Sequence, residues 1–203
     1  LEASHIALGT AFQKPMTPEE LAVFRLSEIN GAQFYMPPTT GSSALKVSAS
    51  LIDVGYLSLQ GFSKADLIAE NGDIRGNGAF EVAGDIRLKA GQVYAPCSLD
   101  FTIAAFDYQQ GAVSRKGSVT IEASGTRSLP LSAGSSLNIY GSIIHQNGVL
   151  RAPFGKIQLG WDGTGTAPRD TQLSNLDFAK TTELVLGSRS VTSVSAIDPL
   201  TGK

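Results

Sequence analysis

The sequence predicts an all-β fold, a right-handed parallel β-helix in which the chain coils as a solenoid with short turns of about 15–20 residues. Short apolar–polar–apolar triplets recur along the chain, and Gly-containing bends separate them. Hydrophobic residues make up 42% of the chain but charged residues only 17%, which is typical of β-proteins with neutral polar faces. The chain of 203 residues does not start with Met and opens on a strand-like pattern. We therefore expect residues 1–203 to form a single β-helix segment, a fragment of a much larger chain.

Five triplets carry the repeat, and they follow one another at intervals of about 15–20 residues. They are Ile86-Arg87-Leu88, Phe101-Thr102-Ile103, Val119-Thr120-Ile121, Leu137-Asn138-Ile139 and Ile157-Gln158-Leu159. Because side chains alternate across a strand, the outer residues of each triplet should point inward and the middle residue outward. This spacing is too short for a propeller blade and fits a solenoid whose strands stack on their predecessors. The middle residues should then form one outward row. Leu57-Ser58-Leu59 and Leu184-Val185-Leu186 are further candidates.

The bends admit a second interpretation. Asn71-Gly72 and Asn147-Gly148 supply positive φ angles at little steric cost, and such pairs also close β-hairpins. The spacing of the triplets favours the solenoid.

Two segments interrupt the repeat. Thr17 suits a helix N-cap, with Pro18 at the first helical position, so we expect one short helix near residues 18–28. Residues 160–183 are rich in Gly, Thr, Asp and Pro and predict a loop insertion that lengthens one turn. Insertions of this kind often carry binding sites in solenoids.

The charge pattern argues against several partners and cofactors. The net charge is −2 and no run of Lys or Arg exceeds two residues, so we expect no nucleic-acid partner. No apolar stretch approaches the roughly 20 residues of a transmembrane helix.

The single cysteine, Cys97, excludes an internal disulfide and is expected to be a small buried hydrophobe, the alternatives being a reactive thiol or an interchain disulfide. His5 and His145 are too far apart to suggest a catalytic triad, and we expect no cofactor and no metal.

Residues 129–161 resemble the filamentous-haemagglutinin-like family of large secreted bacterial exoproteins. The residues that carry the resemblance are Leu137-Asn138-Ile139, Gly141-Ser142-Ile143-Ile144, Gln146-Asn147-Gly148, Leu150-Arg151-Ala152-Pro153, Gly155 and Ile157-Gln158-Leu159. The stretches over residues 71–76 and 83–91 look like the same repeat. The resemblance implies a long right-handed β-helix shaft, two-partner secretion through an outer-membrane transporter of a Gram-negative bacterium, and a role in adhesion or biofilm at the cell surface. It implies no catalytic site.

Two sets of residues are candidates for chemistry. Asp85 and Asp100 precede the inward residues of successive triplets and would lie one strand apart, as an acid pair in a polysaccharide-cleaving enzyme or a calcium site would require. Trp161, Asp162 and Thr164 open the loop insertion, where the indole could stack on a sugar ring or the carboxylate could help to bind calcium. The alternative is that Trp161 only covers the end of a strand.

Three hypotheses follow for function. The first is a structural shaft or adhesin segment with no enzymatic activity, whose partners are neighbouring parts of the same chain, neighbouring copies, and host or surface glycans. The second is a subunit of a self-assembling extracellular filament. The third is a β-helical carbohydrate-active enzyme, which would need carboxylates converging in a groove.

Overall fold

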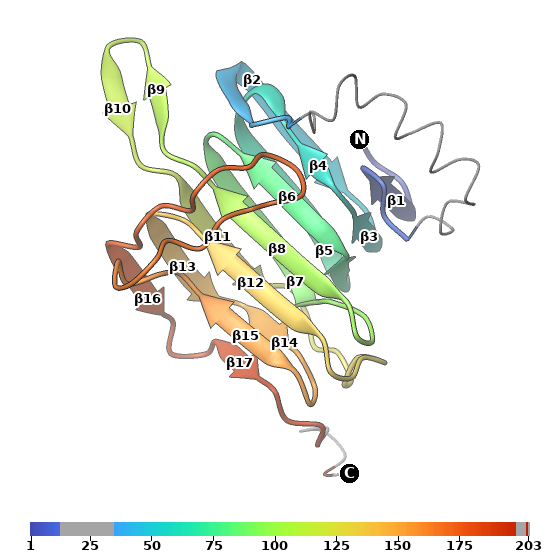
Figure 1. Ribbon diagram of the computed structural model, residues 1–203. Coiled ribbons are helices and arrows are strands. Elements are labelled where there is room, and N and C mark those ends of the chain that lie inside the picture. Colours follow the sequence, from blue (N-terminus) through green and yellow to red (C-terminus); the bar gives the residue numbers. More distant parts are fainter. Residues whose placement is uncertain (13–34, 198–201, 203) are drawn as a thin grey trace, which may run out of the picture.

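The computed structural model describes residues 1–12, 35–197 and 202, and every regular element in these ranges is a β-strand (Figure 1). The helix predicted near residues 18–28 lies outside the described residues. The strands are β1 (His5–Leu8), β2 (Thr39–Ser48), β3 (Leu51–Val54), β4 (Leu57–Ser58), β5 (Gln60–Gly76), β6 (Gly78–Val82), β7 (Asp85–Tyr94), β8 (Asp100–Ala105), β9 (Tyr108–Gln110), β10 (Val113–Arg115), β11 (Ser118–Ala123), β12 (Ser136–Tyr140), β13 (Ile143–Asn147), β14 (Val149–Arg151), β15 (Lys156–Leu159), β16 (Glu183–Leu186) and β17 (Val191–Ser193).

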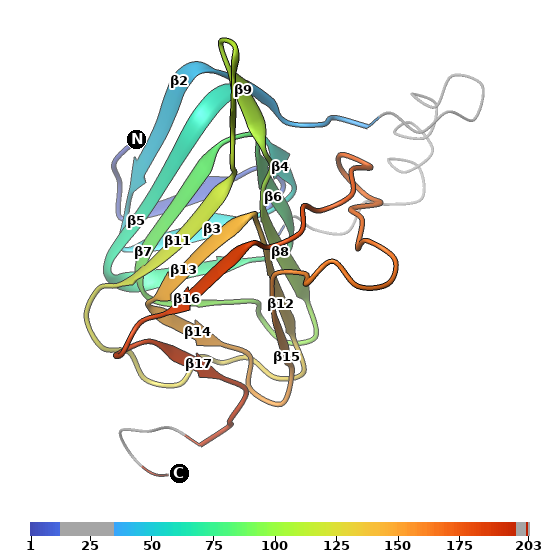
Figure 2. The same ribbon diagram turned by 90° about the vertical axis from the view of Figure 1, so that its left-hand side faces the viewer.

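The strands form two facing sheets and one hairpin. The large sheet has ten strands in the order β1-β3-β5-β7-β11-β13-β16, with β2, β14 and β17 paired beside this path. The small sheet has five strands in the order β15-β12-β8-β6-β4. The strand pairs of both sheets are parallel, whereas β9 and β10 form an antiparallel hairpin. Figure 2 shows the two sheets enclosing the space between them.

The large sheet bends along its longest strand, β5, which forms part of two sides of the molecule. The first part of β5 pairs with β2, its last part pairs with β3, and its register with β7 shifts between Ala69 and Asp73. The chain therefore runs along two sides of the large sheet and then along the small sheet before it returns (Figure 2). This all-β arrangement of parallel sheets is consistent with a solenoid.

Most turns of the chain are longer than the spacing of the triplets predicts. One turn separates two paired residues on neighbouring strands, as it does for Ala65 and Ile86 in the large sheet and for Phe80 and Ile103 in the small sheet. The turn from Ile103 to its partner Ile139 is longer still, because it includes the β9–β10 hairpin and residues 124–135. The predicted turn length is therefore wrong for these turns.

The error has a physical cause. The triplets at residues 86 and 119 lie in the large sheet, and those at residues 101, 137 and 157 lie in the small sheet. Alternation with period two reports which side of a strand is buried, but not which sheet the strand joins. The first three intervals between triplets therefore measure parts of a turn, and only the last, from Leu137 to Ile157, is a full turn. The single outward row is correspondingly split in two, with Thr102, Asn138 and Gln158 in one row and Arg87 and Thr120 in the other.

The predicted inward side chains form the core. Both outer residues of the triplets at residues 86, 101, 119 and 137 are buried, and Ile157 and Leu159 pack against the core from a partly buried position. At the edge strand β16, by contrast, Leu184 and Leu186 are 46% and 58% exposed, since among the described residues no strand lies beyond β16.

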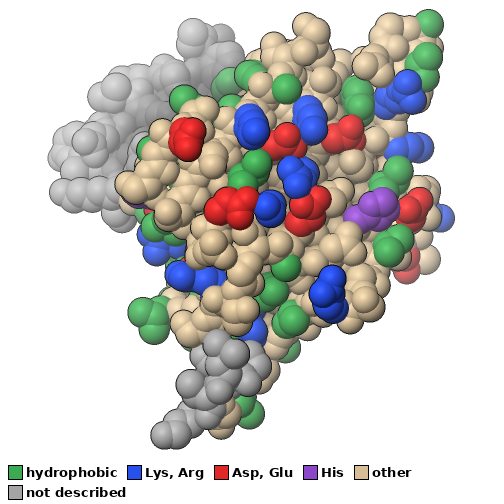
Figure 3. All heavy atoms as spheres, turned by 180° about the vertical axis from the view of Figure 1, so that it is seen from behind, with side chains coloured by type: hydrophobic (Ala, Val, Ile, Leu, Met, Phe, Trp, Pro, Cys, Tyr) green, Lys and Arg blue, Asp and Glu red, His purple; other side chains and the backbone are tan. Residues whose placement is uncertain are grey.

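The outer face of the large sheet carries opposite charges in pairs (Figure 3). Three arginines make two-pronged contacts with carboxylates, two of them from strands of the sheet and one, Arg127, from the connection after β11. The pairs are Arg75 with Asp53, Arg87 with Glu122, and Arg127 with Asp73, at closest N–O distances of 2.6, 2.6 and 3.0 Å. Charge on this face is therefore largely compensated by these ion pairs.

Candidate functional site

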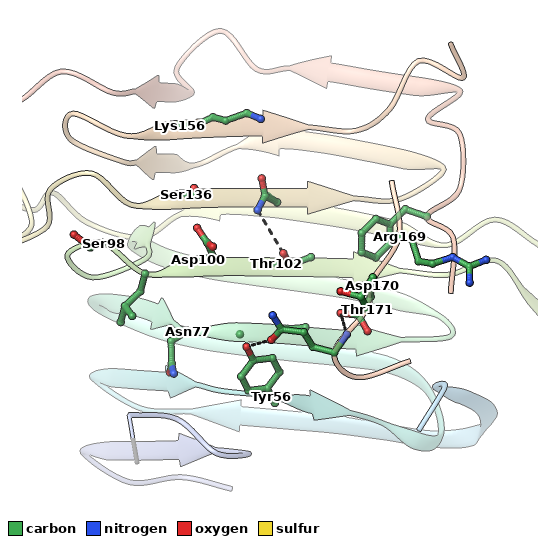
Figure 4. Close-up of a pocket in the computed structure, with 16 residues that line it drawn as sticks. Tyr56, Asn77, Ser98, Asp100, Thr102, Ser136, Lys156, Arg169, Asp170 and Thr171 are labelled. Atoms are coloured by element: carbon green, nitrogen blue, oxygen red, sulfur yellow. Dashed lines mark hydrogen bonds between the residues drawn. The ribbon is translucent and has the colours of Figure 1, made fainter. Parts of the chain in front are cut away.

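The loop insertion predicted near residues 160–183 is present, and it covers part of the small sheet. Residues 160–182 join β15 to β16 without a strand of their own and lie over the outer face of the small sheet (Figure 2). Between this loop and the sheet runs a groove of about 510 Å³ (Figure 4). Its lining residues are Tyr56, Asn77, Gly78, Ala79, Ser98, Leu99, Asp100, Thr102, Ser136, Asn138, Lys156, Arg169, Asp170, Thr171, Gln172 and Phe178.

Two rows of outward side chains form the floor of the groove. The strand register places Asp100, Ser136 and Lys156 in one row and Thr102 and Asn138 in the other. Neighbours within a row are about 4.8 Å apart, the spacing of paired strands. The Asn138 amide Nδ2 donates to the Thr102 hydroxyl at 3.5 Å.

An aromatic cluster attaches the loop to the sheet. The Phe178 ring stacks on Tyr140 with 4.2 Å between centroids and a 10° interplanar angle, and it lies 5.9 Å from the Phe106 ring. Ala104, the neighbour of Tyr140 in the strand ladder, is small enough to leave space for these rings. Phe178 is only 6% exposed, so the loop and the outer face of the small sheet share a small apolar core.

A buried acid forms the second attachment. Glu81 on β6 is 0% exposed, and the Ser174 hydroxyl donates to its Oε1 at 3.0 Å. Burial raises the pKa of Glu81 to about 8; the Ser174 hydrogen bond opposes this shift, and the charge of Asp170 adds to it. Its Oε2 has no hydrogen-bond partner among the described residues. Glu81 is therefore mainly protonated at neutral pH.

The charged groups of the loop wall are already engaged. Asp170 accepts backbone N–H bonds from Leu173 and Ser174, both at 2.6 Å, and a longer one from Gln172. Arg169 Nε donates to Asp177 at 2.6 Å. Contacts within the loop therefore hold both side chains in place.

Tyr56 lies at the opposite end of the floor from Lys156. Its hydroxyl donates to the Gln172 side chain, so the loop contacts the end of the groove floor here (Figure 4). Partial burial, followed by the negative charges of Asp170 and Asp100, raises the pKa of the Tyr56 hydroxyl. Tyr56 is thus a protonated phenol with an aromatic face beside the polar rows.

The predicted site residues lie together, but outside this groove. The Trp161 indole N–H donates to the Thr164 carbonyl at 2.8 Å, and the backbone N–H and hydroxyl of Thr164 both donate to Asp162 Oδ1. These bonds close a compact turn at the start of the loop. Within this turn, Trp161, Asp162 and Thr164 form hydrogen bonds with one another. Their predicted role as a carbohydrate or partner surface stays a prediction.

The predicted acid pair does not form. Asp85 is in the large sheet beside Ser118, whose hydroxyl donates to it at 2.6 Å, whereas Asp100 is in the small sheet beside Ser136. The groove does contain a second carboxylate, Asp170, but Figure 4 shows it and Asp100 on either side of Thr102. Cys97 also departs from expectation, since it is exposed, with its sulfur 3.7 Å from the Leu131 carbonyl.

Other sites can be addressed only within the described ranges. There, no three His, Cys, Asp or Glu side chains gather as a metal site would require. The same residues contain no helix long and apolar enough to cross a membrane.

The groove residues carry little signal in the sequence. Alternation predicts that Thr102 and Asn138 face outward, but nothing in the sequence says that residues 169–178 fold back over them. Comparison with protein-family models, with curated proteins and with solved structures found no match to this chain.

Proposed function

We propose that this chain is a right-handed parallel β-helix segment that serves as a structural shaft in a secreted or cell-surface adhesin. The observation that carries the proposal is the stack of parallel strands, in which inward aliphatic residues stay in register over successive passes of the chain. Each pass contacts chiefly its neighbours, which is how solenoids build extended surfaces. Crossovers between parallel strands of one sheet are right-handed in nearly all proteins.

The assignment to the filamentous-haemagglutinin-like family belongs to the same proposal. It rests on the repeat at residues 129–161. It carries with it secretion through an outer-membrane transporter of a Gram-negative bacterium and a role in adhesion or biofilm.

The solenoid can be tested by removing one turn. Deleting residues 65–85 joins Lys64 to Ile86, which preserves the strand register because Lys64 pairs with Asp85. We expect this variant to keep its β-type circular dichroism and cooperative unfolding. Deleting residues 65–75 removes part of a turn and should abolish both. Equal loss of structure in the two variants would contradict the solenoid.

The surface role needs a test in the source organism. Immunolabelling and protease treatment of intact cells should detect the segment outside, while a cytoplasmic marker stays protected. Deleting the parent gene should reduce attachment or biofilm mass. Recovery of the protein solely from the cytoplasm would refute the surface role.

A second candidate function is a subunit of a self-assembling filament. The exposed edge strand β16 favours it, because Leu184 and Leu186 present apolar surface beside backbone groups that no further described strand pairs. Fibres seen by electron microscopy in wild-type protein, and lost on substitution of Val185 by Lys, would support this alternative.

A further inference from the structure

We propose that the groove beneath residues 160–182 binds a neutral, extended oligosaccharide. The proposal names a ligand class for the adhesive role above, on which it rests. Its tests read binding alone, so they can fail while the structural role stands.

The groove offers side chains, not backbone, to a ligand. The N–H and C=O groups of β8 and β12 are used in parallel ladders on both sides, with β6, β12 and β15. A peptide that adds a strand needs an open sheet edge, which these two floor strands do not provide. The available partners are the hydroxyl of Thr102, the hydroxyl of Ser136 and the amide of Asn138, which both donate and accept.

The charges of the groove balance. Asp170 is bound by backbone N–H groups, and Arg169 is paired with Asp177. Asp100 and Lys156 lie at opposite ends of one row and make no side-chain hydrogen bond or ion pair within the described part of the chain. The lining residues therefore hold no excess of positive charge that would select an anionic polymer.

The polar rows repeat along the stack. Strands β8 and β12 each add one polar outward residue to each row at intervals of about 4.8 Å, and β15 adds Lys156, whereas on β6 the residue beside Thr102 is Ala79. Hydrogen-bonding groups therefore recur over the part of the floor that β8, β12 and β15 form. A polymer of hydroxyl-rich units can use such a series, and the aromatic face of Tyr56 offers a flat surface to the C–H face of a sugar ring. The outer face of the large sheet differs, since its arginines are paired with carboxylates.

The experiment is a binding panel on the whole 203-residue chain. The neutral probes are hexasaccharides of β-1,4-linked glucose, xylose and mannose and of α-1,4-linked glucose, and the anionic probes are hexagalacturonate and a heparin hexasaccharide. Amide shifts in ¹H–¹⁵N spectra report both affinity and position. We expect at least one neutral probe to bind with a Kd between about 10 μM and 1 mM and to shift the amides of β8 and β12. No shift with any neutral probe at about 10 mM, or tighter binding of the anionic ones, would overturn the proposal.

Variants locate the site. Thr102→Val and Asn138→Ala should each weaken binding about three- to tenfold, the effect of losing one or two hydrogen bonds. Thr120→Val is the matched control, since Thr120 is the outward residue of the corresponding triplet in the large sheet, and it should leave Kd unchanged. Trp161→Ala should also leave Kd unchanged. Loss of binding in Trp161→Ala with normal binding in Asn138→Ala would move the site to the Trp161 turn and refute the groove.

Discussion

At the scale of single residues, Glu81 departs most from its ordinary chemistry. It is fully buried, the only hydrogen bond of its side chain to the described residues comes from Ser174, and one of its carboxyl oxygens has no partner among them. The charge of Asp170 that acts on Glu81 is also negative, so ionisation of Glu81 is opposed by burial and by repulsion. The loop therefore contacts, through Ser174, a carboxyl group that is protonated in the folded protein.

This arrangement predicts that stability falls as pH rises. Between pH 4.5, the usual pKa, and about pH 8, the folded-state pKa, the unfolded chain binds fewer protons at Glu81 than the folded chain does. The contribution of Glu81 to the free energy of unfolding should therefore be largest below about pH 4.5. It should decline between pH 4.5 and about pH 8, by on the order of a few kcal/mol.

Glu81→Gln isolates the effect of this group, because the amide keeps an acceptor for Ser174 and cannot ionise. The difference in the free energy of unfolding between the wild type and the variant, measured with urea, should change steadily from pH 5 to pH 8. Fluorescence of Trp161, the only tryptophan, reports on the loop in the same samples. A pH-independent difference would show that Glu81 does not carry this sensitivity.

Burial at single core positions makes a second prediction. Leu137 is completely buried on β12, an interior strand of the small sheet, whereas Leu186 is 58% exposed at the edge of the large sheet. Leu137→Ala should lower the free energy of unfolding by about 2–5 kcal/mol, and Leu186→Ala by less than about 1 kcal/mol. Denaturant unfolding of both variants measures this. Similar losses at the two positions would contradict the assignment of the inward and edge residues.

At the scale of elements, the loop over residues 160–182 is held by side-chain contacts and isolated backbone hydrogen bonds, and not by a strand ladder. Phe178 packs on Tyr140 and Phe106, and Ser174 meets Glu81. The strands below it are fixed on both sides by the parallel ladders. The wall of the groove is therefore the part that can be released without disrupting its floor.

Phe178→Ala should release this wall. Truncation of a buried aromatic ring costs about 3–5 kcal/mol, and here the cost falls on the loop and not on the stacked strands. We expect faster hydrogen exchange over residues 165–180 and a change in Trp161 fluorescence, with unchanged β-type circular dichroism. Phe154→Ala is the matched control because Phe154 is 78% exposed, and it should change none of these. Global unfolding in Phe178→Ala would show that the loop is part of the main core.

At the scale of the whole molecule, the sheets form a stack whose members contact mainly their neighbours. In the middle of the stack, β7, β8, β11 and β12 have strand partners on both sides, whereas β1, β16 and β17 have a partner on one side only among the described residues. Stability in such a stack is close to a sum of local and neighbour terms.

Hydrogen exchange should therefore be graded along the stack. Amides of β8 and β11 should exchange most slowly, and those of β1, β16 and β17 should exchange fastest because opening an end strand breaks one ladder, not two. Mass spectrometry of exchanged peptides gives the profile. Equal protection in the middle and at the ends would indicate one cooperative unit and contradict this account.

The sequence by itself predicted the strands of the five triplets, the buried side of each and the presence of the loop insertion. Alternation in Phe101-Thr102-Ile103 or Leu137-Asn138-Ile139 is a local property of a strand, and it was sufficient to place the apolar residues inward. Only the tertiary structure decided which strands are neighbours. It separated Asp85 from Asp100, divided the outward row between two sheets and brought residues 169–178 over Thr102 and Asn138. The reason is physical: period two fixes the direction of a side chain relative to its own strand, whereas the sheet that a strand joins depends on the length and path of each connection, which local pattern does not encode.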